Sequence, residues 1–143
     1  MRHRKNTVKL GRTSSQRAAL MSSLVSNLIL AKRITTTLPK ARYARRMADK
    51  MVTIGKKQTL AARRHAMSLL KKEDAVAELF KTVAPAMKDR MGGYTRIIKL
   101  GKRMADSSEM CILEFVDYVP SASAPADKKA PAKDDAKAAP AKA

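Results

Sequence analysis

The sequence is poor in aromatic residues, in cysteine and, over its first half, in acids. Its 143 residues include no Trp, two Phe, three Tyr and one Cys. Cys111 has no second cysteine to pair with, so an internal disulfide is excluded and nothing points to an oxidising compartment. Because aromatic rings are so few, Leu, Ile, Val, Ala and nine Met must fill most of the core.

Motifs of catalysis and metal binding are missing as well. The chain has neither a Gly-rich phosphate loop ending in Lys-Ser/Thr nor a His-Glu-x-x-His segment. His3 and His65 lie among arginines, which disfavour a bound metal ion, and Cys111 lies in an apolar run typical of a core position. We therefore expect no enzyme activity, no metal and no cofactor.

Long apolar runs are also absent. Every apolar stretch is broken by Ser, Lys or Arg well before the roughly 20 residues that a membrane span requires. The charged start, Met1 to Lys5, is not followed by an apolar signal region. These features predict a soluble protein without a targeting segment.

Acids are nearly absent from the first half of the chain. Residues 1–72 contain 19 Lys and Arg and a single acid, Asp49, whereas residues 73–118 contain seven Lys and Arg and eight acids. The formal net charge of +19 therefore comes almost entirely from the first half. Self-repulsion on this scale destabilises a free compact chain, so the charge indicates a polyanionic partner.

Composition divides the chain into three parts. Residues 1–12 lack hydrophobic periodicity and acids, which predicts a basic arm that orders on nucleic acid, although a merely solvated tail is the alternative. Residues 119–143 consist mainly of Ala, Pro, Lys, Asp and Ser, and we expect them to be disordered. Residues 13–118 then form a single domain.

Hydrophobic spacing predicts the elements of this domain. Thr13 and Gln16 have the spacing of a capping box that opens a helix ending near Lys32. A β-branched strand over 33–38 follows, and Pro39 ends it. Three more helices are expected. The first runs from Pro39 and ends at Gly55, the second covers 59–70, and the third has its N-cap at Asp74 and ends by Pro85.

Two strands complete the domain. Gly92-Gly93 precedes a strand over 94–100, and a long loop joins it to a strand over 110–116, which predicts an antiparallel hairpin. The order helix, strand, three helices, two strands is typical of an α+β domain, with a small sheet covered by helices on one face.

The candidate binding residues are basic groups at helical spacing. On the helix after Pro39, Arg42, Arg45 and Arg46 lie opposite an inward face that carries Ala44, Met47, Met51 and Ile54. Such a stripe suits rows of phosphates, and an ordinary solvated face is the alternative. Around the capping box, Ser14 and Ser15 stand beside Arg12 and Arg17 at a helix N-terminus, where phosphate is favoured. Lys9 belongs to the arm.

Tyr94 and Arg96 are a further candidate pair. Following Gly92-Gly93, they are placed to stack on and pair with an unpaired base, but packing of Tyr94 in the core is equally compatible with the sequence. No aromatic residue is interleaved with the basic blocks, so the chain lacks the stacking platform of single-strand binders. This favours folded RNA, recognised by its backbone and shape.

Four segments resemble one family: MRHRK at the start, LGRTSSQR from Leu10, TTLPKA from Thr36 and GGYTRI from Gly92. In order and spacing they are similar to bacterial large-subunit ribosomal protein seventeen over about residues 1–118. The resemblance implies a small mixed three-stranded sheet covered by helices. It carries an RNA-contact role onto Arg2, His3, Arg4, Lys5, Arg12, Ser14, Ser15, Arg17, Lys40, Arg42 and Arg96.

The resemblance also implies partners and a location. We expect a structural constituent of the 50S subunit, bound to folded 23S rRNA beside other ribosomal proteins near the nascent-chain exit. Because Met1 directly begins the first motif, a bacterial cytoplasmic ribosome is favoured over an organelle. A nucleoid DNA-binding protein is the rival, but no bending wedge or dimerisation element is evident. Adsorption to membranes would need a basic helix with Trp or Phe on its apolar face, and the sequence has no such helix.

Overall fold

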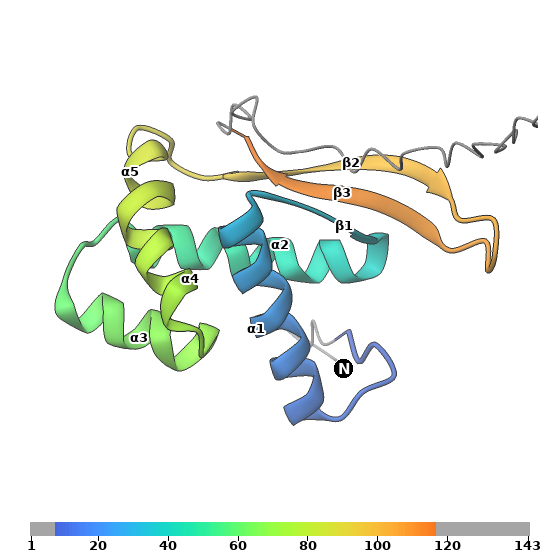
Figure 1. Cartoon of the computed structure of the whole chain (residues 1–143), viewed down its shortest axis with the longest axis horizontal. Coiled ribbons are helices and arrows are strands. Elements are labelled where there is room, and N and C mark those ends of the chain that lie inside the picture. The colour runs from blue at the N-terminus through green and yellow to red at the C-terminus, as the bar shows by residue number, and fades with distance from the viewer. Residues whose placement is uncertain (1–7, 117–143) are drawn as a thin grey trace, which may run out of the picture.

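The computed structural model describes residues 8–116 and confirms the α+β class (Figure 1). The basic residues Arg2, His3, Arg4 and Lys5 and the predicted tail over 119–143 lie outside the described residues. The elements are α1 (Ser14–Ala31), β1 (Arg33–Thr37), α2 (Leu38–Gly55), α3 (Leu60–Leu70), α4 (Glu73–Glu78), η1 (Leu79–Val83), α5 (Ala84–Ala86), β2 (Thr95–Lys102) and β3 (Glu109–Phe115).

The three strands form one sheet in the order β1-β3-β2. Both neighbouring pairs are antiparallel, with Thr35 and Ile98 on either side of Ile112, so the expectation of a mixed sheet is wrong. The reason is the central position of β3, which runs opposite to both of its neighbours and separates the two parallel strands. All helices lie on one side of the sheet (Figure 1), as predicted.

Helix α2 is the element that joins the sheet to the other helices. It contacts all three strands and also α1, α3, η1 and α5. Ala41, Ala44 and Ala48 on its inner face are at most 1% exposed, and these small side chains allow a close approach to the sheet. From β3, Cys111, Leu113 and Phe115 complete the core beneath it, which confirms the core assignment of Cys111.

Polar side chains of α1 and of the residue before it cap this helix and join it to α3. Thr13 caps α1 with the predicted capping box, because its hydroxyl accepts from the Gln16 amide while its own amide donates to the Gln16 side chain. The buried Ser22 and Ser26 hydroxyls of α1 both donate to the Leu70 carbonyl at the end of α3. These bonds satisfy a helix-terminal acceptor and hold α1 against α3.

The helical segment from α4 to α5 differs from prediction at its ends. Lys72, rather than Asp74, is the N-cap, since the helix begins one residue before Asp74. Its predicted stripe is buried as expected, at Val76, Leu79, Phe80 and Val83. Pro85 lies inside the last turn, and because its nitrogen has no hydrogen to donate, the turn before it is widened into the π-helix η1.

Gly55 ends α2 for a reason other than the expected one. A glycine at a helix end usually supplies a left-handed residue, but Gly55 is the last helical residue and the left-handed conformation falls on Gln58, at φ 52°. A Cβ on Gly55 would lie 3.0 Å from the Ala84 Cβ and 3.4 Å from Leu79 Cγ. The position is therefore glycine because α2 packs closely against the helical segment η1–α5.

Within residues 8–116, no helix has both the length and the apolar character that a membrane crossing requires.

Replacing Gly55 by alanine should lower the free energy of unfolding by about 1 kcal/mol. Overpacking against Ala84 costs about 1–3 kcal/mol, and the better helix propensity of alanine offsets up to about 1 kcal/mol of this. Urea unfolding of Gly55→Ala, Ala84→Gly and the double variant measures the effect. The double variant should lose less than the sum of the two single losses; additive losses would exclude the clash.

The pairing of Lys32 with Glu78 should make stability depend on acid pH. Lys32 Nζ lies 2.6 Å from Glu78 Oε1, and this hydrogen bond holds the pKa of the carboxyl below its ordinary value of 4.5. A lowered folded-state pKa stabilises the protein above the unfolded value, and that contribution is lost as the pH falls through the folded value. The free energy of unfolding of the wild type should fall between about pH 5 and pH 3. In Glu78→Gln this fall should be smaller by about 0.5–1 kcal/mol.

Urea unfolding at several pH values measures this contribution. Lys32→Gln is the matched variant, since it leaves the carboxyl in place and removes its partner. Both variants should flatten the acid part of the profile, and a wild-type profile in both would exclude the pair as its source.

Candidate nucleic-acid interface

The outer side of α2 presents the predicted arginine stripe. Arg42, Arg45 and Arg46 are exposed, and they stand opposite the buried alanines that pack on the sheet. Because α2 is held along its length by the sheet and by α1, the three side chains extend from a rigid backbone at a fixed spacing. A rigid row of guanidinium groups can contact successive phosphates.

These arginines lack acidic partners in the described part of the chain. Within residues 8–116, no carboxylate lies within 4.0 Å of Arg42, Arg45 or Arg46. Asp49, the single acid of the basic half, instead accepts a hydrogen bond from Thr95 Oγ1 at 3.1 Å. The positive charge of α2 is therefore not neutralised from inside the domain.

The start of α1 lies beside this stripe. Ser14 and Ser15 are exposed at the first turn, and Arg17 is half-buried and lines the same groove as Arg46. Arg12 and Lys9 are exposed, although the Arg12 guanidinium donates to the Leu10 carbonyl at 2.9 Å. Ser14, Arg17 and Arg46 line one groove, and Arg42 and Arg46 line a second pocket, so the starts of α1 and α2 are adjacent there. We refer to the candidates on these two segments together as the basic face, namely Arg12, Ser14, Ser15, Arg17, Arg42, Arg45 and Arg46.

The residues that precede α1 also approach this face. Val8 lines a shallow pocket together with Pro39, Arg42, Tyr43 and Arg46. The chain that enters from the arm therefore runs beside the N-terminal half of α2. Lys40, another predicted contact, lies half-buried in the first turn of that helix.

Arg96 and Tyr94 lie away from the basic face. Arg96 extends from β2, and its Nε donates to Glu114 Oε1 at 2.5 Å. On the other side of Glu114, Arg33 Nε lies 3.3 Å from Oε2. This three-strand ion cluster, Arg33, Glu114 and Arg96, spans the sheet from β1 through β3 to β2. Part of the charge of Arg96 is therefore already neutralised within the domain.

The Tyr94 ring is a core side chain rather than a surface for stacking. It is 4% exposed, and Lys56 Nζ lies 4.7 Å above its centroid. The hydrogen bond from Lys56 lowers the pKa of the phenol. Of the two alternatives that the sequence left open for Tyr94, packing is the one in the structure.

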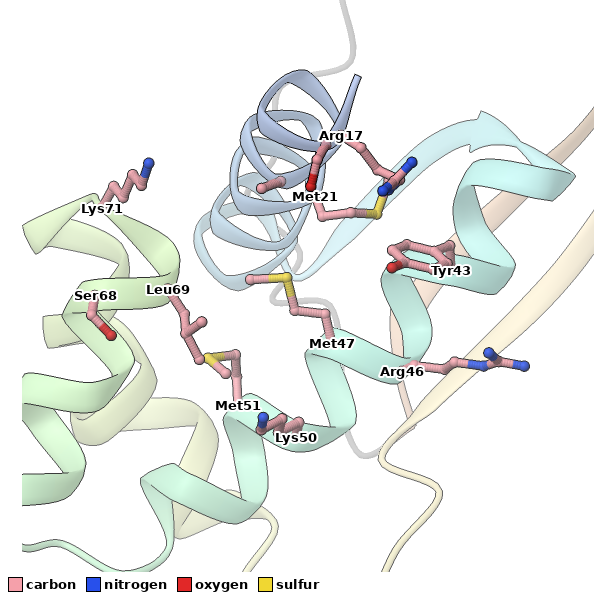
Figure 2. A pocket seen from close by; sticks show the side chains of 12 residues that line it. Arg17, Met21, Tyr43, Arg46, Met47, Lys50, Met51, Ser68, Leu69 and Lys71 are labelled. Carbon is pink, nitrogen blue, oxygen red and sulfur yellow. The ribbon is translucent and has the colours of Figure 1, made fainter. Parts of the chain in front are cut away.

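Three groups near the basic face were missed from the sequence, namely Tyr43, Lys50 and Lys71. They line a groove between α1, α2 and α3 together with Arg17 and Arg46 (Figure 2). Lys50 follows Arg46 by four residues on α2, so helical spacing alone contains the signal for it. Lys71 has no such signal, because only the packing of α3 brings it to the groove.

Comparison with known proteins identifies the family. A family model described as Ribosomal protein L17 matches residues 20–116. The chain belongs to this family. The resemblance based on the four sequence motifs is thereby confirmed, and so is the prediction that the chain is not an enzyme, because the family consists of structural ribosomal proteins.

Several bacterial relatives match most of the chain, each named large ribosomal subunit protein bL17. The Finegoldia magna protein is 51% identical over 113 residues, which cover 79% of this chain and 86% of the relative. The Fusobacterium nucleatum protein is 47% identical over 116 residues, 81% of this chain and the whole relative. The Syntrophotalea carbinolica protein is 44% identical over 132 residues, 91% of this chain and 85% of the relative.

Among residues 8–116, no group of three or more His, Cys, Asp or Glu side chains is arranged to hold a metal ion.

Neutralising Glu114 should destabilise the domain by about 1–2 kcal/mol. The Glu114 side chain is only 9% exposed, whereas Arg33 and Arg96 are 52% and 57% exposed, so solvent screens the pairs in part. Urea unfolding of Glu114→Gln measures the loss. Asp106→Asn, which breaks the exposed Arg103–Asp106 pair, is the control and should leave the unfolding midpoint nearly unchanged. Equal effects of the two variants would contradict a special role for the three-strand ion cluster.

Proposed function

We propose that this chain is a structural component of the large ribosomal subunit in the bacterial cytoplasm and binds folded 23S rRNA through its basic face. The observation that carries the proposal is the set of arginines on α1 and α2 without carboxylate partners in residues 8–116. Relatives named as large-subunit proteins support the same assignment.

The mechanism is charge neutralisation on a rigid surface. Arg42, Arg45 and Arg46 bind phosphates at the spacing that α2 sets, while Arg12, Ser14, Ser15 and Arg17 bind others at the start of α1. Lys9 and the arm residues Arg2, His3, Arg4 and Lys5 extend the contact along the RNA, and Lys40 adds to it at the start of α2. Arg96 makes a separate contact from the sheet. Release of counterions from the RNA supplies most of the binding free energy.

The proposed partners include neighbouring proteins near the nascent-chain exit, without self-association. Sedimentation of cell extracts tests the assignment against DNA and membrane binding. The chain should migrate with the large subunit, and ribonuclease, but not deoxyribonuclease, should release it. Loss of the complex with deoxyribonuclease, or flotation with membranes, would overturn the proposal.

Removing the arginine stripe should weaken the salt dependence of RNA binding. Each phosphate contact contributes about 0.7–0.9 to the slope of log affinity against log salt, so Arg42, Arg45 and Arg46 changed together to Gln should reduce it by about 2–3. Filter binding of large-subunit rRNA across a salt series measures the slope.

A charge-matched variant separates this effect from net charge. Lys81, Lys88 and Lys99 are exposed and lie outside α1 and α2, so changing them together to Gln removes the same charge from other surfaces. Its slope should stay close to that of the wild type. Equal losses in the two variants would show that only net charge matters and that α2 has no specific role.

A further inference from the structure

A groove of about 520 Å³ lies between α1, α2 and the end of α3 (Figure 2). Its floor is apolar and is lined by Met21, Met47, Met51 and Leu69. Met21 and Met51 are buried, whereas Met47 and Leu69 are half-buried. The volume is in the range of about 300–1,000 Å³ found for small-molecule sites. The groove thus has room and apolar surface for one flat ring system.

The rim of the groove is positively charged. Arg17, Arg46, Lys50 and Lys71 line it, and within residues 8–116 none of them has a carboxylate within 4.0 Å. Tyr43 stands in the wall between Arg17 and Arg46 and is itself half-buried (Figure 2). An occupant that complements this groove needs both an apolar face and a negative charge.

Met47 shows that the floor is open to such an occupant. The sequence pattern places Met47 on the same inward face as Met51, yet Met51 is fully buried and Met47 is not. Met47 therefore presents exposed side-chain surface to the groove, whereas Met51 does not. Thioethers are polarisable and pack favourably against aromatic rings.

A nucleotide combines the two required properties. Its base offers an aromatic face for the methionines, and its phosphate offers a negative charge for the rim. A peptide side chain from a neighbouring protein would fill the floor but leave four cations unpaired unless it were also acidic. RNA-binding proteins that read sequence usually do so at unpaired bases turned out of the helix.

We propose that the groove receives one unpaired nucleotide of the ribosomal RNA, with its base on the methionine floor and its phosphate at the rim. This inference rests on the proposed function, and it adds a contact with a base to a surface that otherwise binds phosphates. The groove then adds a contact that depends on the base, and so on the RNA sequence, which phosphate contacts alone do not provide.

Two alanines on α1 provide a matched pair of variants. Ala18 and Ala19 are both exposed, but Ala18 lines the groove and Ala19 does not. Leucine at either position keeps the charge and is a good helix former, so stability should change little. Ala18→Leu fills part of the groove and should weaken binding to protein-free large-subunit rRNA about tenfold, which corresponds to about 1.4 kcal/mol. Ala19→Leu should stay within about twofold of the wild type.

The salt slope and chemical probing of the RNA bases complete the test. Ala18→Leu should leave the slope unchanged, because no phosphate contact is removed. Dimethyl sulfate or carbodiimide probing should find an unpaired base that wild-type protein and Ala19→Leu protect and Ala18→Leu does not. Because protection by the wild type does not depend on how a variant folds, absence of a protected unpaired base would overturn the inference.

Other outcomes separate this inference from the function on which it rests. If both leucine variants bind naked rRNA as the wild type does, the groove takes no nucleotide although RNA binding stands. If, in addition, Ala18→Leu enters ribosomes poorly, the groove belongs to a neighbouring protein and the inference is again wrong. If the wild-type chain itself fails to bind rRNA, the proposed function fails.

Discussion

The close packing of α2 on the sheet is the constraint on which the rest of the structure depends. Three alanines on its inner face bring the helix backbone near the strands, and Gly55 at its end allows Ala84 of α5 to pack closely against it. One helix thus carries the core on one side and the arginine stripe on the other. A loop bearing the same arginines would lose more conformational entropy on binding and would not hold their spacing.

The distribution of acids follows from this arrangement. The carboxylates in the described ion pairs lie on the later elements, where Glu78, Asp106 and Glu114 pair with Lys32, Arg103 and two strand arginines. Each of these pairs stabilises the fold locally, and none of them reaches the outer side of α2. Asp49 is on that helix, but its carboxylate accepts from Thr95. Within residues 8–116, these four acids therefore serve contacts inside the fold, and Arg42, Arg45 and Arg46 keep no carboxylate partner.

Local patterns predicted the fold where one side chain or one helical stripe decides the outcome. The Thr13 capping box, the buried stripe from Val76 to Val83 and the N-terminal boundary of α3 are of this kind, because neighbours in sequence determine them. Apart from the N-cap of α4, which is Lys72 and not Asp74, the larger errors concern packing between elements. The strand order that makes the sheet antiparallel and the contact that requires Gly55 both depend on elements that are distant in sequence.

The same distinction explains which part of the candidate site was visible in the sequence. The arginine stripe is periodic on a single helix, so its exposure followed from spacing, and Lys50 extends it by the same rule. The groove is built from α1, α2 and α3, and no periodicity within any one of them indicates that Met21, Met47 and Leu69 share a floor or that Lys71 joins the rim. The arginines proposed to contact phosphates are thus encoded by spacing on one helix, whereas the groove proposed to receive a base arises only from the tertiary fold.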